Sequence, residues 1–134
     1  MSRVHELAGE HLEFWRERHL CTVTTIRRNG SPHVVPMGVM VDTENDTEWG
    51  VAWAITSRTS QKVANLLSSS DPRVAVCQVD GRRWSTIEGK AEVRDDPESV
   101  AEAVRRYIER YQQPRENPVR VAIRISITSA IGNL

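Results

Sequence analysis

The sequence predicts a single, mostly β domain in which an antiparallel sheet closes into a small six-stranded barrel with helices packed outside it. Three observations support this class. Six segments have strand character, and tight turns such as Asn29-Gly30 and Asp80-Gly81 join several of them with few strand–helix–strand crossovers. Neither G-x-G-x-x-G nor G-x-x-x-x-G-K-[ST] occurs, which disfavours the common nucleotide-binding α/β folds.

Length and charge narrow the class of protein further. The 134 residues suit one domain over 1–134, and 39% hydrophobic content is ordinary for a globular chain. Lys+Arg and Asp+Glu are both 18, so the net charge is zero and we expect no nucleic-acid partner. No apolar run approaches the roughly 20 residues of a membrane span, and the N-terminus shows no secretion signal, so we expect a cytoplasmic protein.

The first elements are predicted from side-chain periodicity. Apolar and aromatic residues recur three or four positions apart and predict a helix over 3–18. Residues 20–26 alternate like a strand, the Asn-Gly turn follows at 28–31, and a second strand is predicted over 32–41.

The second strand is interrupted by Pro36 and Gly38. Proline cannot donate a ladder hydrogen bond, and glycine weakens a strand or marks a close backbone approach. The segment is either a bulge at a corner of the barrel or a backbone edge left open for a flat ligand.

Two further helices and four strands complete the domain. Thr59-Ser60-Gln61 opens a short helix, and Asp96-Pro97 is an N-cap followed by proline at the first position of a longer one. The remaining strands are predicted over 49–56, 74–79, 84–93 and 119–131.

Cysteine and histidine usage gives no indication of a metal site. Cys21 and Cys77 are far apart in apolar runs and are expected to be reduced core thiols. No H-E-x-x-H motif occurs among the four histidines. We therefore predict that the protein binds no metal.

The most informative segment joins a strand end to the start of the short helix. It carries hydroxyl groups, an amide and the cations Arg58 and Lys62. Such a segment can bind a phosphate group through charge-assisted hydrogen bonds. The alternative is an ordinary capped surface helix with solvated cations.

Three other segments could line the same cavity: the interrupted strand at 33–36, the turn at 78–81, and Arg82-Arg83-Trp84. Trp84 could cover a planar ring, or it could be a core or dimer residue. The two arginines could bind an anionic tail or simply be solvated. Since no G-x-S-x-G motif or other catalytic constellation is visible, we predict no catalytic side chain, and any chemistry would come from a bound cofactor.

The run from about 18 to 127 resembles the split β-barrel flavin and deazaflavin oxidoreductases, the pyridoxamine 5′-phosphate oxidase-like superfamily. The resemblance rests on N-G-S-P-H-V-V-P at 29–36, S-Q-K-V-A-N-L at 60–66 and D-P-R-V at 71–74. Q-V-D-G-R-R-W at 78–84, followed by Glu88-Gly89, and the segment 111–118 resemble the branch that uses coenzyme F420.

The resemblance implies a six-stranded split barrel that forms homodimers with cofactor sites at the subunit interface. It implies that Ser60, Gln61 and Lys62 hold the F420 phosphate, that the strand at 33–36 lies along the deazaflavin ring, and that 78–84 approach from the same or the other subunit. The predicted cofactor-binding residues are His33, Val34, Val35, Pro36, Ser57, Arg58, Ser60, Gln61, Lys62, Gln78, Gly81, Arg82 and Trp84.

The expected activity is hydride transfer from reduced F420 to a conjugated small-molecule acceptor, with the bilin biliverdin as the expected acceptor. Two alternatives stay open. One is an FMN-dependent oxidase or reductase of the same fold, and the other is a non-catalytic F420-binding carrier.

Overall fold

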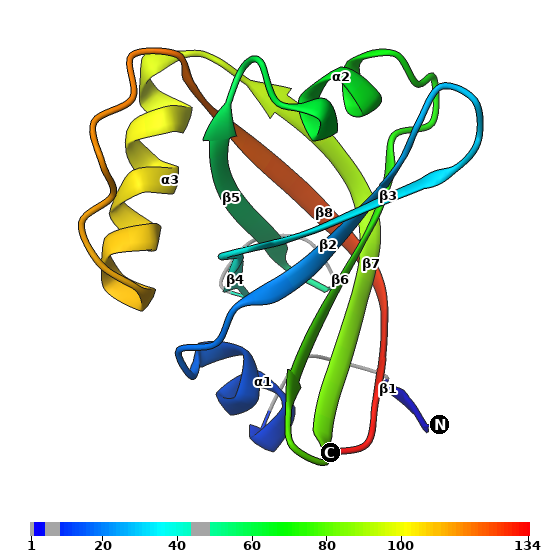
Figure 1. Ribbon diagram of the computed structural model, residues 1–134. Helices are drawn as coiled ribbons and strands as arrows, with labels where there is room; N and C mark the ends of the chain where they lie inside the picture. The colour runs from blue at the N-terminus through cyan, green and yellow to red at the C-terminus, as the bar shows by residue number, and fades with distance from the viewer. Residues whose placement is uncertain (1, 5–8, 44–48) are drawn as a thin grey trace.

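The computed structural model describes residues 2–4, 9–43 and 49–134 (Figure 1). The strands are β1 (Ser2–Val4), β2 (Cys21–Ile26), β3 (Pro32–Met37), β4 (Met40–Asp42), β5 (Val51–Ser57), β6 (Arg73–Asp80), β7 (Arg83–Arg94) and β8 (Arg120–Gly132). The helices are α1 (Gly9–Arg16), α2 (Gln61–Leu67) and α3 (Pro97–Arg110).

The strands form one antiparallel sheet in the order β3-β2-β6-β7-β8-β5-β4, and β1 pairs with β8 outside this path. Hairpins join β2 to β3, β6 to β7 and β4 to β5. The predicted class, a mostly β domain with three helices around an antiparallel sheet, is confirmed.

The strand count and the closure of the barrel were predicted wrongly. The path holds seven strands rather than six, and its end strands β3 and β4 do not pair, so the sheet is not closed. The extra strand arises because the predicted strand 32–41 divides at Gly38 and Val39. A Cβ atom at Gly38 would lie 2.7 Å from the Tyr111 ring. The Tyr111 ring therefore leaves no room for a side chain at position 38, where the two strands separate.

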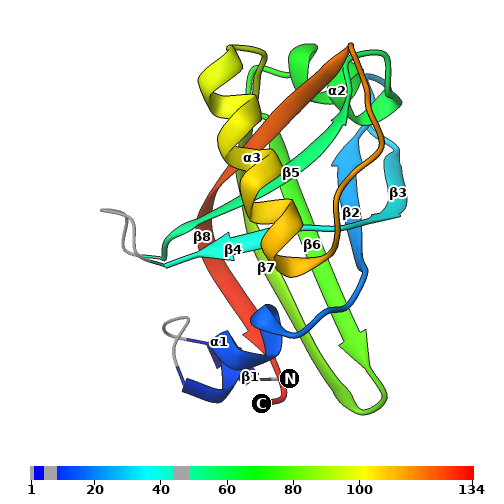
Figure 2. The same ribbon diagram turned by 90° about the vertical axis from the view of Figure 1, so that its left-hand side faces the viewer.

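The end of α3 bonds to the segment before β2, to Val39 between β3 and β4, and to Gln78 of β6. Tyr111 Oη donates to the carbonyl of His19 at 2.7 Å, and Val39 N donates to Tyr111 Oη at 3.3 Å. Arg110 donates to the carbonyls of Glu17 and Val39 and to Gln78 Oε1. Figure 2 shows α3 lying across β5, β8 and β4. Side-chain hydrogen bonds from the end of α3 thus link three parts of the chain that are distant in sequence.

The predicted N-terminal helix is shorter than expected. Its first part is the strand β1, in which Ser2 is the register partner of Gly132, and helix α1 begins only at Gly9 with φ +57°. Leu7 and Ala8, which the predicted stripe includes, lie outside the described residues. The stripe was predicted wrongly for Val4, which belongs to β1, and is confirmed for His11 and Trp15, which are buried on α1. β1 satisfies backbone groups along the end of β8, a pairing that helical periodicity cannot indicate.

The barrel interior holds alternate residues of the strands, as predicted for β8, where Val121, Ile123, Ile125 and Ile127 are buried. Cys21 belongs to this core, and burial raises the pKa of its thiol. Cys77 is only half-buried, so the prediction of two core thiols holds for one of them. Among the described helices, none combines the length and the apolar character that crossing a bilayer requires.

The docking of α1 predicts a pH dependence of stability. His11 Nε2 lies 2.5 Å from Ser85 Oγ, which also accepts from Trp15 Nε1 at 2.9 Å. Burial lowers the pKa of His11 below 6.5, so the unfolded chain binds more protons between the folded and unfolded pKa values. Stability from this group is therefore full above about pH 7 and falls as the pH drops below 6.5.

We expect the His11→Gln variant to lack this pH-dependent contribution to stability. For one titrating group, the free energy of unfolding changes by at most about 1.4 kcal/mol per pH unit. The measurement compares the free energy of unfolding of both proteins between pH 5.5 and 7.5. Parallel curves for the two proteins would show that His11 does not supply the dependence.

Candidate functional site

Lys62 is a half-buried cation at the start of α2. Burial lowers the pKa of its ammonium group, which means that the charged form lacks full solvation or compensation. Lys62 forms no ion pair and no hydrogen bond with any residue that the structure describes. An anionic ligand group beside it would supply the missing compensation.

The neighbours of Lys62 tie α2 to the sheet. Ser60 Oγ accepts from Thr56 Oγ1 at 3.3 Å and makes no side-chain cap bond to the helix. Gln61 Nε2 donates to Asn65 Oδ1 at 2.7 Å, and Asn65 Nδ2 donates to Thr25 Oγ1 at 2.9 Å. Asn65 is buried and fixes the orientation of α2 against β2. We did not single out Asn65 from the sequence, although a polar residue on the buried side of a helix was a signal of such a link.

Strand β3 lies next to this end of α2. His33 is the register partner of Thr25, the residue that Asn65 contacts. His33 and Val35 are half-buried on one face, whereas Val34 and Pro36 are exposed on the other. β3 ends the sheet path, so its second edge pairs with no described strand. His33 Nδ1 is buried and has no hydrogen-bond partner in the described part of the chain. The register of β3 with β2 runs without a bulge from Pro32 to Met37, so β3 presents an unpaired edge, and its use by a flat ligand stays a prediction.

A cavity of about 440 Å³ adjoins the end of β5. Ser57 lines it and accepts from Asn117 Nδ2 at 2.9 Å, and Thr56 connects its wall to Ser60. Arg58 is exposed and lies 3.9 Å from Asp95. The cavity is lined by Leu20, Met37, Gly38, Ile55, Thr56, Ser57, Tyr107, Gln112, Gln113, Pro114, Arg115, Asn117 and Arg120.

The predicted residues after position 77 do not join this group within one chain. Gln78 is fully buried. Its amide oxygen accepts from Arg110, and its Nε2 donates to the carbonyl of Phe14 at 2.7 Å. Gly81, Arg82 and Trp84 lie at the β6–β7 turn, at the end of the barrel opposite α2 (Figures 1 and 2). The structure thus separates the predicted site into a set beside α2 and a set at the far end.

Near that far end, Glu17, His19 and Asp80 form a cluster whose ligand atoms lie within 4.8 Å of one another. Arg83 donates to both oxygens of Glu17, at 2.9 and 2.8 Å, and to Asp80. These bonds hold the pKa of Glu17 at about 2. The positive charge of Arg83 compensates the negative charges of Glu17 and Asp80. That the protein binds no metal stays a prediction.

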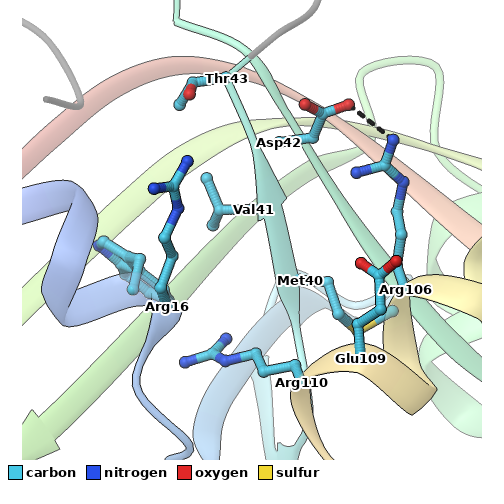
Figure 3. Close-up of a pocket in the computed structure, with 9 residues that line it drawn as sticks. Arg16, Met40, Val41, Asp42, Thr43, Arg106, Glu109 and Arg110 are labelled. Atoms are coloured by element: carbon cyan, nitrogen blue, oxygen red, sulfur yellow. Dashed lines mark ion pairs between the residues drawn. The ribbon is translucent and has the colours of Figure 1, made fainter.

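A second cavity of about 330 Å³ lies between α1, β4 and α3 (Figure 3). Arg106 forms an ion pair with Asp42 at 2.9 Å in it. None of the predicted site residues lines this cavity. Its lining is Trp15, Arg16, Met40, Val41, Asp42, Thr43, Arg106, Glu109 and Arg110.

The fold and the site beside α2 define a class. Residues 7–132 match the model of the pyridoxamine 5′-phosphate oxidase family, and the chain belongs to this family. Over 101 residues it is 40% identical to an F420H(2)-dependent biliverdin reductase of Mycobacterium tuberculosis (strain CDC 1551 / Oshkosh), a match that covers 75% of this chain and 69% of the relative.

Two solved structures share the fold. A conserved hypothetical protein of Mycobacterium tuberculosis has a TM-score of 0.75 and 26% identity, covering 98% of this chain and 89% of the other. A structure named F420 reductase has a TM-score of 0.73 and 22% identity, covering 92% of this chain and 98% of the other.

Proposed function

We propose that the protein is an F420-dependent reductase that transfers a hydride from reduced F420 to a conjugated acceptor, with biliverdin as the expected acceptor. The structural observation that carries the proposal is Lys62, a half-buried and uncompensated cation. It follows two residues after Ser60, whose hydroxyl accepts from Thr56 in the wall of a cavity of ligand size. The 40% identical relative, which is named for F420 and biliverdin, supports this choice of cofactor and acceptor.

The residues beside α2 fit the phosphate of F420. Lys62 supplies the charge, and the Ser60 hydroxyl and Gln61 amide stand within two residues of it. Helix α2 has only seven residues, so its dipole adds little and the side chains dominate. Arg58, more exposed and 3.9 Å from Asp95, adds a second positive charge at the same turn.

The open edge of β3 and the adjoining cavity fit a planar ring. The unpaired backbone groups of the segment 33–36 would orient the ring, and Ser57 and Thr56 would lie at its phosphate side. When bound, reduced F420 supplies the hydride. The protein binds and orients the ring and excludes water from it, so no side chain need form a covalent bond.

We also propose that two copies complete the site as a homodimer. Ile26, Val34 and Val79, from three adjacent strands, share the outer face of the sheet and are 46%, 56% and 60% exposed. Such apolar exposure is typical of an interface. A two-fold contact that sets one barrel antiparallel to the other would bring the partner's β6–β7 turn towards α2. This arrangement would reunite the two separated sets of predicted residues.

The test mixes purified protein with chemically reduced F420 and biliverdin without oxygen and follows the bilin absorbance. We expect bilin reduction that depends on both protein and F420. Rates equal to a protein-free control would refute the choice of biliverdin. Inactivity towards quinones and other enones as well, with F420 still bound, would favour the carrier alternative over an enzyme.

A second candidate is an FMN-dependent oxidase or reductase. Family membership favours it, because the family is related to flavin enzymes and is named for pyridoxamine 5′-phosphate oxidase. Separate titrations with F420 and FMN distinguish the two. We expect tighter binding of F420, and a clear preference for FMN would replace the cofactor in the proposal.

A further inference from the structure

The cavity of about 440 Å³ at the end of β5 continues into a third cavity. A cavity of about 290 Å³ is lined by Arg18, His19, Leu20, Tyr107, Tyr111 and Gln112. It shares Leu20, Tyr107 and Gln112 with the cavity of about 440 Å³. Together they form one elongated groove between the start of β2, the end of α3 and the segment that leads to β8. We call it the α3 groove.

The charge of the α3 groove has one sign. Among the residues that the structure describes, no Asp or Glu lines either cavity, whereas Arg18 lies at one end and Arg115 and Arg120 at the other. None of these arginines forms an ion pair with a described residue, and the Arg120 side chain donates to the carbonyl of Arg115. The cavity in Figure 3 differs, because Asp42 and Glu109 line it beside its arginines. In a chain of zero net charge, three uncompensated arginines along one groove indicate an anionic ligand.

The floor of the groove suits a flat, apolar body. Ile55, Met37 and the Tyr107 ring line it, and Leu20 at the junction is 67% exposed. Amide groups of Gln112 and Gln113 add neutral hydrogen-bonding partners. A ligand that matches these features is long, conjugated and negatively charged near its periphery.

We propose that the α3 groove is the acceptor site and selects elongated conjugated acceptors that carry carboxylates, with Arg18, Arg115 and Arg120 as specificity-determining residues. This inference rests on the proposed function, because it places the acceptor beside the F420 ring. Guanidinium groups bind carboxylates through paired hydrogen bonds, so an acceptor without free carboxylates loses these contacts.

The position of Arg18 favours the acceptor over the acidic tail of F420 as the source of the carboxylates. The ring and the tail of F420 are attached on opposite sides of its phosphate. The groove runs from Met37 and Gly38 at the end of β3 to Arg18. An acceptor stacked on a ring along β3 would therefore reach Arg18.

The test compares biliverdin with its dimethyl ester, in which both propionate groups are uncharged. The readouts are KM in the F420-dependent assay and, separately, the Kd of each bilin in the presence of oxidised F420, measured by absorbance. We expect the wild-type protein to prefer the free acid. Arg18→Gln and the double variant Arg115→Gln/Arg120→Gln should raise KM and Kd for the acid about 5- to 20-fold and leave the ester unchanged.

Arg105→Gln is the matched control, since Arg105 is exposed on α3 and contacts Glu102 and Glu109 away from the groove. Arg105→Gln should leave KM and Kd unchanged for both the acid and the ester. Equal values for acid and ester in the wild-type protein overturn the inference. The inference is also overturned if the groove variants lose F420 affinity while the ratio of the Kd values for acid and ester stays unchanged. That result would assign the arginines to the tail of the cofactor.

The binding readout separates this inference from the proposed function. If no acceptor is reduced but the acid binds more tightly than the ester and loses affinity in Arg18→Gln, the groove is supported and the reductase is not. If bilin is reduced but the arginine variants match the control, the reductase is supported and the groove is not.

Discussion

Replacing Lys62 with alanine is expected to weaken F420 binding by about 10- to 100-fold, the scale of a lost charge-assisted hydrogen bond of about 1.5–3 kcal/mol. The ammonium group is half-buried and has no counter-ion among the described residues, so a bound phosphate would be its main partner. Fluorescence titration of F420 measures the change. Lys62→Arg should keep part of the affinity, because it retains the charge with a different geometry.

The chain contains a matched control for this experiment. Lys90 is its only other lysine; it is exposed and pairs with Asp71 at 3.0 Å. Lys90→Ala should leave F420 affinity unchanged. Thermal unfolding of Lys62→Ala should match or exceed that of the wild type, because the variant removes an uncompensated cation. Equal F420 affinity in Lys62→Ala and Lys90→Ala would show that the phosphate binds elsewhere.

The second large effect is on stability. Arg110→Met should lower the free energy of unfolding by about 2–4 kcal/mol. Methionine fills much of the same volume but donates no hydrogen bond, so the carbonyls of Glu17 and Val39 and the buried Gln78 amide oxygen lose their donor. Because these groups belong to the segment before β2, to the link between β3 and β4 and to β6, the variant tests whether Arg110 holds these parts of the chain together.

Chemical denaturation of Arg110→Met and Arg105→Met makes the comparison. Arg105 belongs to the same helix, but its ion pairs with Glu102 and Glu109 are exposed, and such pairs contribute about 0–1 kcal/mol. If the free energy of unfolding falls no more in Arg110→Met than in Arg105→Met, packing rather than these hydrogen bonds holds the end of α3 against Glu17, Val39 and Gln78.

The strands and helices followed largely from local patterns. Alternation in β8 and the Asp96-Pro97 cap predicted their elements to within a few residues, because each depends on neighbours in the chain. The segment with Lys62 was also visible, since a strand end, a cluster of hydroxyls and a rare lysine lie within a few positions. Residues that act through contacts distant in sequence were not. Arg110 and Arg18 carry no local signal that distinguishes them, and the signal at Asn65, a polar residue on the buried side of a helix, does not show what it contacts.

Gln78 shows the limit most clearly. Its motif placed it with the ligand, but the structure buries it completely beside Arg110, which lies 32 positions away. Gly81, Arg82 and Trp84 share that motif yet lie at the opposite end of the barrel from α2, since an eight-residue strand separates the two ends. A motif records which residues occur together in the chain, and not which surface each side chain reaches.

The sequence by itself determined the antiparallel β class, most element boundaries and the cation beside α2, because periodicity and turn chemistry are local properties of the chain. Only the tertiary structure decided that the sheet stays open between β3 and β4, that Arg110 at the end of α3 links Glu17, Val39 and Gln78, and that three arginines border one groove. These features depend on side chains that meet across tens of residues. Their partners are chosen by packing and by the need to satisfy buried polar groups, which no window of sequence contains.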